Sequence, residues 1–143
     1  MCGINGIYNH LNLNDSKSQV NKMNLLSSHR GPDNSGIYED ADLVLGHVRL
    51  SIIDLDARSN QPFVSANQQI VLSFNGEIYN FQALKKELEE YPFSTHSDTE
   101  VIVAAYLKWG INFLDKLDGM FAFALWDRSA KQLVLARDKM GIK

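Results

Sequence analysis

Short apolar runs, separated by polar and glycine-containing segments, dominate this sequence. Runs of roughly four to eight residues that are rich in β-branched and aromatic side chains are typical of β-strands. The first run, residues 3–8, contains glycines and predicts a buried strand where two backbones approach closely. The remaining runs predict strands at residues 43–50 and 70–74 and a hairpin formed by residues 120–126 and 133–137.

Apolar residues at helical spacing predict a first helix around Val20, Met23 and Leu26, after a polar loop over residues 9–17. A second loop is expected at residues 29–33, where glycine and proline interrupt the pattern.

Two further helices are predicted from their start signals. Residues 81–90 form a short amphipathic pattern that Asn80 is placed to cap. Ser97 and Glu100 fit a capping box, in which each side chain satisfies a free amide at the start of a helix. This last helix is expected to end at Gly110.

The strands lie at the start, middle and end of the sequence with the helices grouped between them, which favours an α+β fold over alternating β-α-β units. The 143 residues correspond to one domain, and the longest apolar run is far shorter than the roughly 20 residues that span a bilayer. The amino terminus carries no secretory signal, and a net charge of -3 comes without basic clusters. We therefore expect a cytoplasmic domain that binds a small molecule and neither membrane nor nucleic acid.

The one cysteine of the sequence, Cys2, follows the initiator Met1. A single cysteine is most often a small buried residue. Its position favours another interpretation, because removal of Met1 leaves a thiol and a free α-amine on the same residue. The α-amine titrates at about 7.7 to 8.0, so part of it can accept the thiol proton near neutral pH. Cys2 is therefore the candidate nucleophile.

The dipeptide Asn75-Gly76 follows the strand predicted at residues 70–74 and is expected to end it. Asn-Gly is a strong signal for a hairpin turn, and this is the simpler interpretation. A side-chain amide beside an unhindered backbone amide is also a pair of hydrogen-bond donors, as an oxyanion hole requires. Both interpretations stay open from the local sequence.

Two charged residues have structural alternatives to a functional role. Arg49 interrupts an apolar run, so it needs either a salt bridge or a carboxylate-bearing ligand. Asp98 lies at a predicted helix start, where its charge stabilises the helix without any further role. The four histidines share no metal-ligand spacing and no cysteine pair accompanies them, so we expect no metal site. No phosphate-binding glycine loop occurs either, so the common nucleotide-binding signature is absent.

Several motifs, in this order, resemble one family: the glutaminase domain of asparagine synthetases, which are class II glutamine amidotransferases. The resemblance runs nearly from end to end. The motifs are Met1-Cys2-Gly3-Ile4, His29-Arg30-Gly31-Pro32-Asp33, Arg49-Leu50-Ser51-Ile52-Ile53-Asp54, Asn75-Gly76-Glu77-Ile78-Tyr79-Asn80, Ser97-Asp98-Thr99-Glu100, Asp118-Gly119-Met120-Phe121-Ala122-Phe123-Ala124, and Arg137-Asp138 with Gly141.

The resemblance implies a four-layer αββα sandwich of antiparallel sheets, the fold of amino-terminal-nucleophile hydrolases. It also implies that Cys2 attacks the side-chain amide of glutamine and forms a γ-glutamyl thioester. The α-amine of Cys2 would act as the general base, and Asn75 with the Gly76 amide would hold the oxyanion.

The same resemblance implies how the substrate is bound. Arg49 would bind the α-carboxylate of glutamine, while Glu77 and Asp98 would receive its α-ammonium group. Backbone groups that line the same pocket would come from Leu50, Ser51, Ile52 and Ile53.

Whole asparagine synthetases carry a second domain, which uses ATP and Mg²⁺ to activate aspartate and receives the ammonia. No Ser-Gly-Gly loop of that domain occurs here, so we expect glutamine hydrolysis without a cofactor, and a synthetase domain or subunit as partner. The family's glutaminase domain continues beyond the last motif, so residues 1–143 are interpreted as incomplete at the C-terminal end and marginally stable alone. The alternatives are an amidotransferase that amidates a sugar acid in polysaccharide synthesis and a non-catalytic glutamine-binding remnant.

Overall fold

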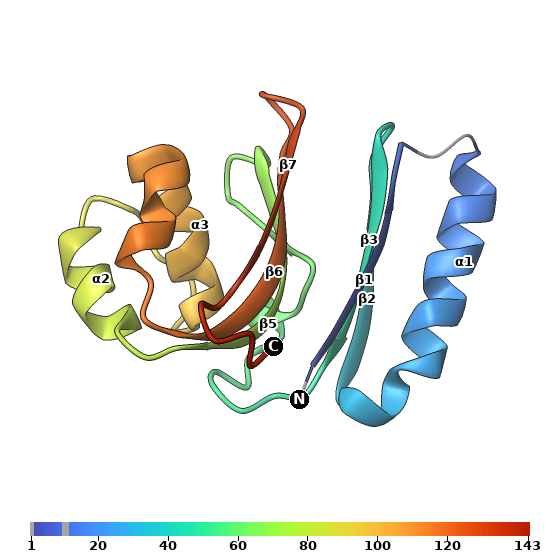
Figure 1. Ribbon diagram of the computed structural model, residues 1–143, viewed down its shortest axis with the longest axis horizontal. Helices are drawn as coiled ribbons and strands as arrows, with labels where there is room; N and C mark the ends of the chain where they lie inside the picture. Colours follow the sequence, from blue (N-terminus) through green and yellow to red (C-terminus); the bar gives the residue numbers. More distant parts are fainter. Residues whose placement is uncertain (1, 10–11) are drawn as a thin grey trace.

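Four layers make up the computed structural model, which describes residues 2–9 and 12–143. Helix α1 covers one sheet, a second sheet packs on the first, and helices α2 and α3 cover the outer face of the second sheet (Figure 1). Neighbouring strands are antiparallel throughout both sheets. The αββα sandwich implied by the family resemblance is therefore confirmed, while the predicted removal of Met1 concerns a residue outside the described part.

The first sheet has the strand order β1-β3-β2 and the second has the order β4-β5-β6-β7. The elements are β1 (Gly3–Tyr8), α1 (Leu13–Leu26), η1 (Ser28–Arg30), β2 (Asn34–Glu39), β3 (Leu43–Arg49), η2 (Ala57–Ser59), β4 (Phe63–Val64), β5 (Ile70–Ile78), α2 (Phe81–Glu87), α3 (Asp98–Trp109), η3 (Gly110–Lys116), β6 (Gly119–Asp127) and β7 (Gln132–Arg137).

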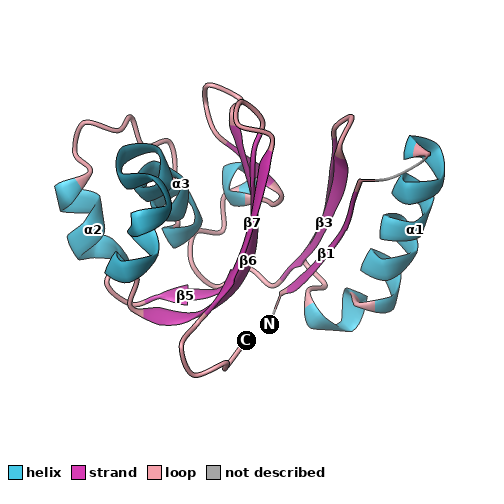
Figure 2. Cartoon of the chain, turned by 45° about the horizontal axis from the view of Figure 1, so that its top comes forward, coloured by secondary structure: helices cyan, strands magenta, loops and turns pink. Residues whose placement is uncertain are grey.

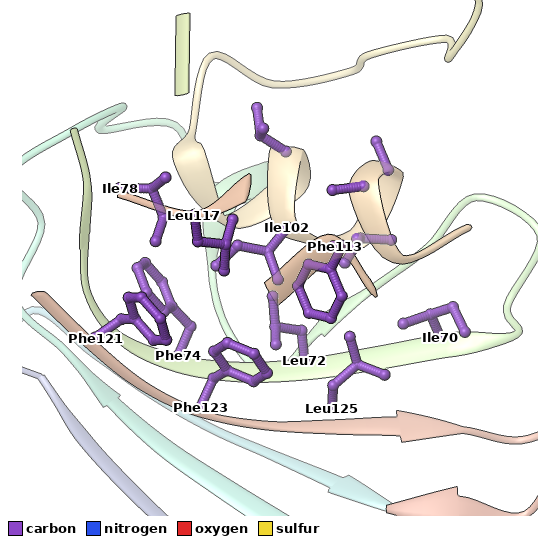
Figure 3. Close-up of a cluster of buried hydrophobic side chains, with 14 of the residues drawn as sticks. Ile70, Leu72, Phe74, Ile78, Ile102, Phe113, Leu117, Phe121, Phe123 and Leu125 are labelled. Carbon is purple, nitrogen blue, oxygen red and sulfur yellow. The ribbon is translucent and has the colours of Figure 1, made fainter. Parts of the chain in front are cut away.

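Side chains alternate across β5 between two different layers. Leu72, Phe74 and Ile78 point toward the helices and join the larger core, in which Figure 3 shows phenylalanine rings beneath Ile102 of α3. Val71 points the other way and packs in the layer between the two sheets. Residues 73, 75 and 77 follow Val71, so they face the first sheet.

The sequence predicted that Asn75-Gly76 ends its strand. In the structure β5 instead continues through this dipeptide to Ile78. Gly76 pairs with Phe121 of β6, and a Cβ atom at this glycine would lie 2.2 Å from the carbonyl oxygen of Met120. The glycine is required for close strand packing, so the hairpin-turn interpretation is wrong.

Helix α1 begins at Leu13, within the segment predicted as a loop. The Asn12 side chain accepts hydrogen bonds from the amides of Asn14 (3.0 Å) and Asp15 (3.3 Å) and caps the helix. Most side chains of the first helical turns face solvent and are polar. The spacing of apolar residues therefore did not predict this part of the helix. Residues 10 and 11 of the predicted loop lie outside the described residues.

The predicted capping box of α3 is confirmed in one half only. The Ser97 side chain accepts from the Thr99 amide at 3.1 Å, as expected. Glu100 does not reach back to Ser97; its carboxylate instead accepts hydrogen bonds from the amides and hydroxyls of Ser94 and Thr95. Glu100 therefore holds the preceding loop against the helix.

Other boundaries also differ from the prediction. Asn80 precedes α2, but its side chain forms no hydrogen bond to an amide of that helix. Instead its Nδ2 donates to the Lys116 carbonyl at 2.8 Å, and its Oδ1 accepts from the Asp118 amide at 3.1 Å. The strand β1 is an edge strand in which only Gly3 is buried, rather than a buried strand. The strands β2 and β4 were not predicted because neither is a distinct apolar run. The final hairpin and the end of α3 at Gly110 are confirmed.

Candidate active site

Most of the predicted site residues line one pocket, although they come from four separate segments of the chain. The segments are the start of β1, the end of β3 with its following loop, the end of β5 and the start of α3. Figure 2 shows that the start of β1 and the end of the chain lie at the same end of the two sheets. The predicted residues that line the pocket are Cys2, Arg49, Leu50, Ile52, Ile53, Asn75, Gly76, Glu77 and Asp98.

Ser51 is the one predicted residue that does not line the pocket. Its amide instead donates to the Asp33 carboxylate at 2.7 Å, and the Asp33 amide donates to the Arg49 carbonyl at 3.0 Å. Asp33 thus supports the loop that carries Leu50. Further lining residues that sequence analysis missed are Ser59, Ser97, Thr99, Met120 and Lys143.

Cys2 lies half-buried against the backbone of Leu50. The Leu50 amide donates to the sulfur at 3.4 Å, and the thiol lies 3.7 Å from the Leu50 carbonyl oxygen. Arg30 donates from Nε to the Cys2 carbonyl at 3.3 Å, so the main chain of Cys2 is also held. The role of Arg30 was not predicted, although it belongs to one of the recognised motifs.

Arg49 is buried, with 5% of its surface exposed, and forms no ion pair with any carboxylate in the described residues. In the described part of the chain its guanidinium donates only to uncharged oxygens, among them the Asn60 side chain at 2.7 Å and the Asp54 carbonyl. The salt-bridge interpretation is therefore wrong. A buried cation without a counter-charge is unfavourable, so the position suits an anionic ligand.

Asp54 connects the loop after β3 to the start of α3. Its carboxylate accepts from the Ser59 hydroxyl and from the His96 amide, each at 2.8 Å. Burial opposes the charge, but these hydrogen bonds outweigh it and lower the pKa of Asp54 below its ordinary value. Asp54 is a structural link between the loop after β3 and the segment before α3, both of which contribute residues to the pocket.

The Gly76 amide is directed to the free edge of β5. Its pairing partner, Phe121, uses both backbone groups on the opposite side: the Phe121 amide donates to the Asp138 carboxylate, and its carbonyl accepts from the Asp138 amide. Because backbone groups alternate in direction along an antiparallel strand, Gly76 then points away from β6 and toward the pocket.

The amides two residues before and after Gly76 point to the same edge, and side chains satisfy both. The Phe74 amide donates to Gln61 Oε1 at 2.6 Å, and the Ile78 amide donates to Asp98 Oδ2 at 3.0 Å. No such side chain reaches Gly76 among the residues that the structure describes. Its N–H is therefore the donor that this edge leaves available to a ligand.

Asn75 and Glu77 lie on the face of β5 that looks toward the first sheet, which carries Cys2. Within residues 2–9 and 12–143, neither side chain forms a hydrogen bond or an ion pair. Both are partly exposed in the pocket, so the Asn75 amide and the Glu77 carboxylate are free to contact a ligand.

Asp98 is 4% exposed and also lacks a cationic partner in the described part of the chain. Burial raises the pKa of its carboxyl, and the nearby charge of Glu77 raises it further, against hydrogen bonds from the Ile78 and Thr99 amides. Two carboxylates and one guanidinium, none with a counter-ion in the part of the chain that the structure describes, thus share the pocket.

Comparison with known proteins agrees with this geometry. Residues 1–143 match the family model of the glutamine amidotransferase domain. The chain belongs to this family. The resemblance to asparagine synthetases predicted from the motifs is confirmed as well, since this amidotransferase domain is 44% identical to asparagine synthetase B (glutamine-hydrolysing) of Escherichia coli K12 over 99% of its length.

Other relatives extend the comparison of the amidotransferase domain. It is 41% identical to asparagine synthetase (glutamine-hydrolysing) 1 of Arabidopsis thaliana and 41% identical to amidase chry2 of Gibberella zeae, over 99% and 100% of its length. It spans about a quarter of these three relatives, namely 26%, 24% and 23% of their lengths.

A solved structure has the same fold. Glutamine phosphoribosylpyrophosphate amidotransferase from Bacillus subtilis superposes on 98% of the amidotransferase domain and 38% of its own chain, with a TM-score of 0.78 and 25% identity. No helix in the described residues is long and apolar enough to cross a membrane.

Proposed function

We propose that residues 1–143 form a glutaminase domain, which hydrolyses the side-chain amide of glutamine to glutamate and ammonia. The observation that carries this proposal is the charge pattern around Cys2. One guanidinium and two carboxylates that have no counter-ion among the described residues line the same pocket as the thiol. A free amino acid supplies the complementary carboxylate and ammonium groups.

The proposed roles follow from this match. Arg49 binds the α-carboxylate through paired N–H groups, and Glu77 with Asp98 binds the α-ammonium group. Opposite charges within one pocket select a free amino acid over a peptide or a simple amide. The side chain of glutamine then extends toward Cys2, with backbone groups of Leu50, Ile52 and Ile53 beside it.

In the proposed reaction the Cys2 sulfur bonds to the amide carbon of glutamine, and the thiol proton passes to the α-amine that removal of Met1 exposes. The tetrahedral intermediate expels ammonia, which takes that proton, and leaves a γ-glutamyl thioester. The α-amine then deprotonates a water molecule, which attacks the thioester and releases glutamate. The proton returns to the thiolate.

The oxyanion of both tetrahedral intermediates is held by the Asn75 side-chain amide and the Gly76 N–H. Support comes from the free edge of β5, where the neighbouring amides of Phe74 and Ile78 are already satisfied. Donors that are fixed in place before the reaction stabilise developing charge without reorganisation.

We further propose that the ammonia serves a synthetase domain or subunit that converts aspartate to asparagine with ATP and Mg²⁺. The similarity to two glutamine-hydrolysing asparagine synthetases supports this assignment. The chain spans about a quarter of those relatives, so the choice of acceptor belongs to sequence outside this domain.

Glutamate release by the purified protein, beside a Cys2→Ala variant, tests the glutaminase proposal. Intact mass first establishes that Met1 is absent from both samples. We expect glutamate release that the variant lacks, because the alanine has no nucleophile. Glutamine binding without turnover by processed wild-type protein would contradict hydrolysis and favour a non-catalytic binding domain.

A further inference from the structure

His47 is a buried polar residue that the proposed chemistry does not use. It lies in β3, where every residue is buried, and its own side chain is 0% exposed. The other side chains of this strand are apolar except for Arg49 at its end. A polar ring in such a layer is unfavourable unless its hydrogen bonds compensate for burial.

The hydrogen bond of His47 determines which ring nitrogen carries the proton. Nε2 lies 2.9 Å from the carbonyl oxygen of Phe74, which can only accept, so Nε2 carries the proton. Nδ1 is buried with no partner among the described residues, as befits a neutral ring. Burial lowers the pKa of His47 to about 4, in spite of the Phe74 hydrogen bond and with help from the Arg49 charge. His47 is therefore a neutral donor at physiological pH.

Phe74 is held through both of its backbone polar groups. His47 from β3 binds its carbonyl at 2.9 Å, and Gln61 binds its amide at 2.6 Å. Both side chains take the place of a neighbouring strand, because β4 pairs with β5 only at Leu72 and Val71. The peptide groups immediately before Asn75 are thus fixed by side chains rather than by a strand.

A second buried hydrogen bond joins the same segments of the two sheets. The Ser73 hydroxyl donates to the Gly46 carbonyl at 3.1 Å. This bond lies one residue earlier on each strand and does not contact Phe74. It links the sheets without touching the peptide that precedes the proposed oxyanion donors, so it offers a matched comparison for His47.

We propose that His47 is a positioning residue for the oxyanion site, acting through the Phe74 carbonyl. The first sheet carries Cys2 and Arg49, and the second carries Asn75. The His47 hydrogen bond joins these sheets one residue before Asn75 and fixes the distance between nucleophile and oxyanion donors. This inference rests on the proposed glutaminase function.

The test compares His47→Gln with His47→Asn in steady-state glutamine hydrolysis. The glutamine amide reaches as far as Nε2, whereas the asparagine amide is too short to reach Phe74. A misplacement of about 1 Å can cost roughly 100-fold in rate, so we expect His47→Asn to lower kcat about 10- to 100-fold with KM within about twofold. His47→Gln is expected to restore kcat to within about fivefold of wild type.

Two controls separate positioning from general loss of packing. Ser73→Ala removes the neighbouring inter-sheet bond and is expected to leave kcat near the wild-type value. Alkylation of Cys2 by iodoacetamide should proceed at the wild-type rate in His47→Asn, because that reaction needs no oxyanion site. Equal losses in His47→Gln and His47→Asn, a matching loss in Ser73→Ala, or a change in KM alone would overturn the inference.

If His47→Asn does not fold, Gln61→Met takes its place, because it removes the acceptor of the Phe74 amide and keeps His47. The same loss of kcat is expected there, and a wild-type kcat would overturn the inference. The Cys2→Ala comparison separates the two proposals. If Cys2→Ala abolishes turnover but the His47 and Gln61 variants keep the wild-type kcat, only the positioning role is contradicted. If the wild-type protein shows no turnover, both proposals are contradicted.

Discussion

The two faces of the second sheet differ in the contacts that they make: one packs against helices and the other against the first sheet. Among the described residues, 18 buried hydrophobic residues form the core between the second sheet and its helices, whereas five form the core between the two sheets. The inter-sheet layer instead includes buried polar contacts, such as those of His47 and Ser73, and ends at the pocket. Apolar burial on the helix side stabilises the fold, whereas the pocket at the end of the inter-sheet contacts holds the charged groups beside Cys2.

This comparison predicts that substitutions in the two layers have separable effects. The largest change in stability is expected for Phe113→Ala. Phe113 is fully buried, and its ring contacts those of Tyr106 and Phe123 with centroids 5.8 and 5.9 Å apart. Loss of a buried phenylalanine costs about 3 to 5 kcal/mol in free energy of unfolding, which urea titration measures. The kcat of the remaining folded protein should stay near wild type.

Leu135→Ala is the control for that prediction, because Leu135 is 71% exposed on β7. Its free energy of unfolding should remain within about 0.5 kcal/mol of wild type. A kcat that falls in proportion to stability in Phe113→Ala would show that the two layers are not separable.

Asn75→Ala is expected to produce the opposite pattern. Loss of one oxyanion donor lowers kcat by roughly 10²- to 10³-fold. The Asn75 side chain has no hydrogen-bond partner in the described residues, so the free energy of unfolding should change by less than about 0.5 kcal/mol. Steady-state kinetics and urea titration on the same sample measure both quantities. A large loss of stability with unchanged kcat would place Asn75 in the framework rather than in the site.

The smallest expected effect is a pH dependence that originates at Asp98. Its raised pKa means that protonation, and with it the loss of attraction for an α-ammonium group, begins at a higher pH than for an ordinary aspartate. We expect kcat/KM for glutamine to fall as the pH drops through this pKa. Asp98→Asn should remove that fall and weaken glutamine binding at neutral pH, as pH profiles of kcat/KM would reveal.

The contribution of Asp98 to the free energy of unfolding should change with pH in the opposite direction to kcat/KM. A carboxyl whose pKa is higher in the folded than in the unfolded protein favours folding below the unfolded pKa, and this contribution is lost as pH rises through the folded pKa. Asp98→Asn keeps an oxygen acceptor for the Ile78 amide and removes the buried charge. At neutral pH the variant should be at least as stable as wild type; a clear loss of stability would assign Asp98 a structural role.

Much of this protein was predictable from local sequence, because local physics determines it. Alternating or continuous apolar runs located β1, β3 and the final hairpin, and the Ser97 cap located the start of α3. The position of Cys2 next to Met1 indicated its candidate chemistry without any tertiary information. The ordered motifs then identified the family and, through it, most of the residues that line the pocket.

Only the tertiary structure decided features that depend on partners distant in sequence. Pairing with β6 carries β5 through Asn75-Gly76, although the dipeptide alone favours a turn. Whether Arg49 meets a carboxylate depends on how the loop after β3 folds, and no spacing reveals it. The contacts of Gln61 and His47 with Phe74 join residues 13 and 27 positions apart. Local sequence determines the elements. Whether an amide or a charged side chain has a partner depends on residues that only the tertiary structure brings close to it.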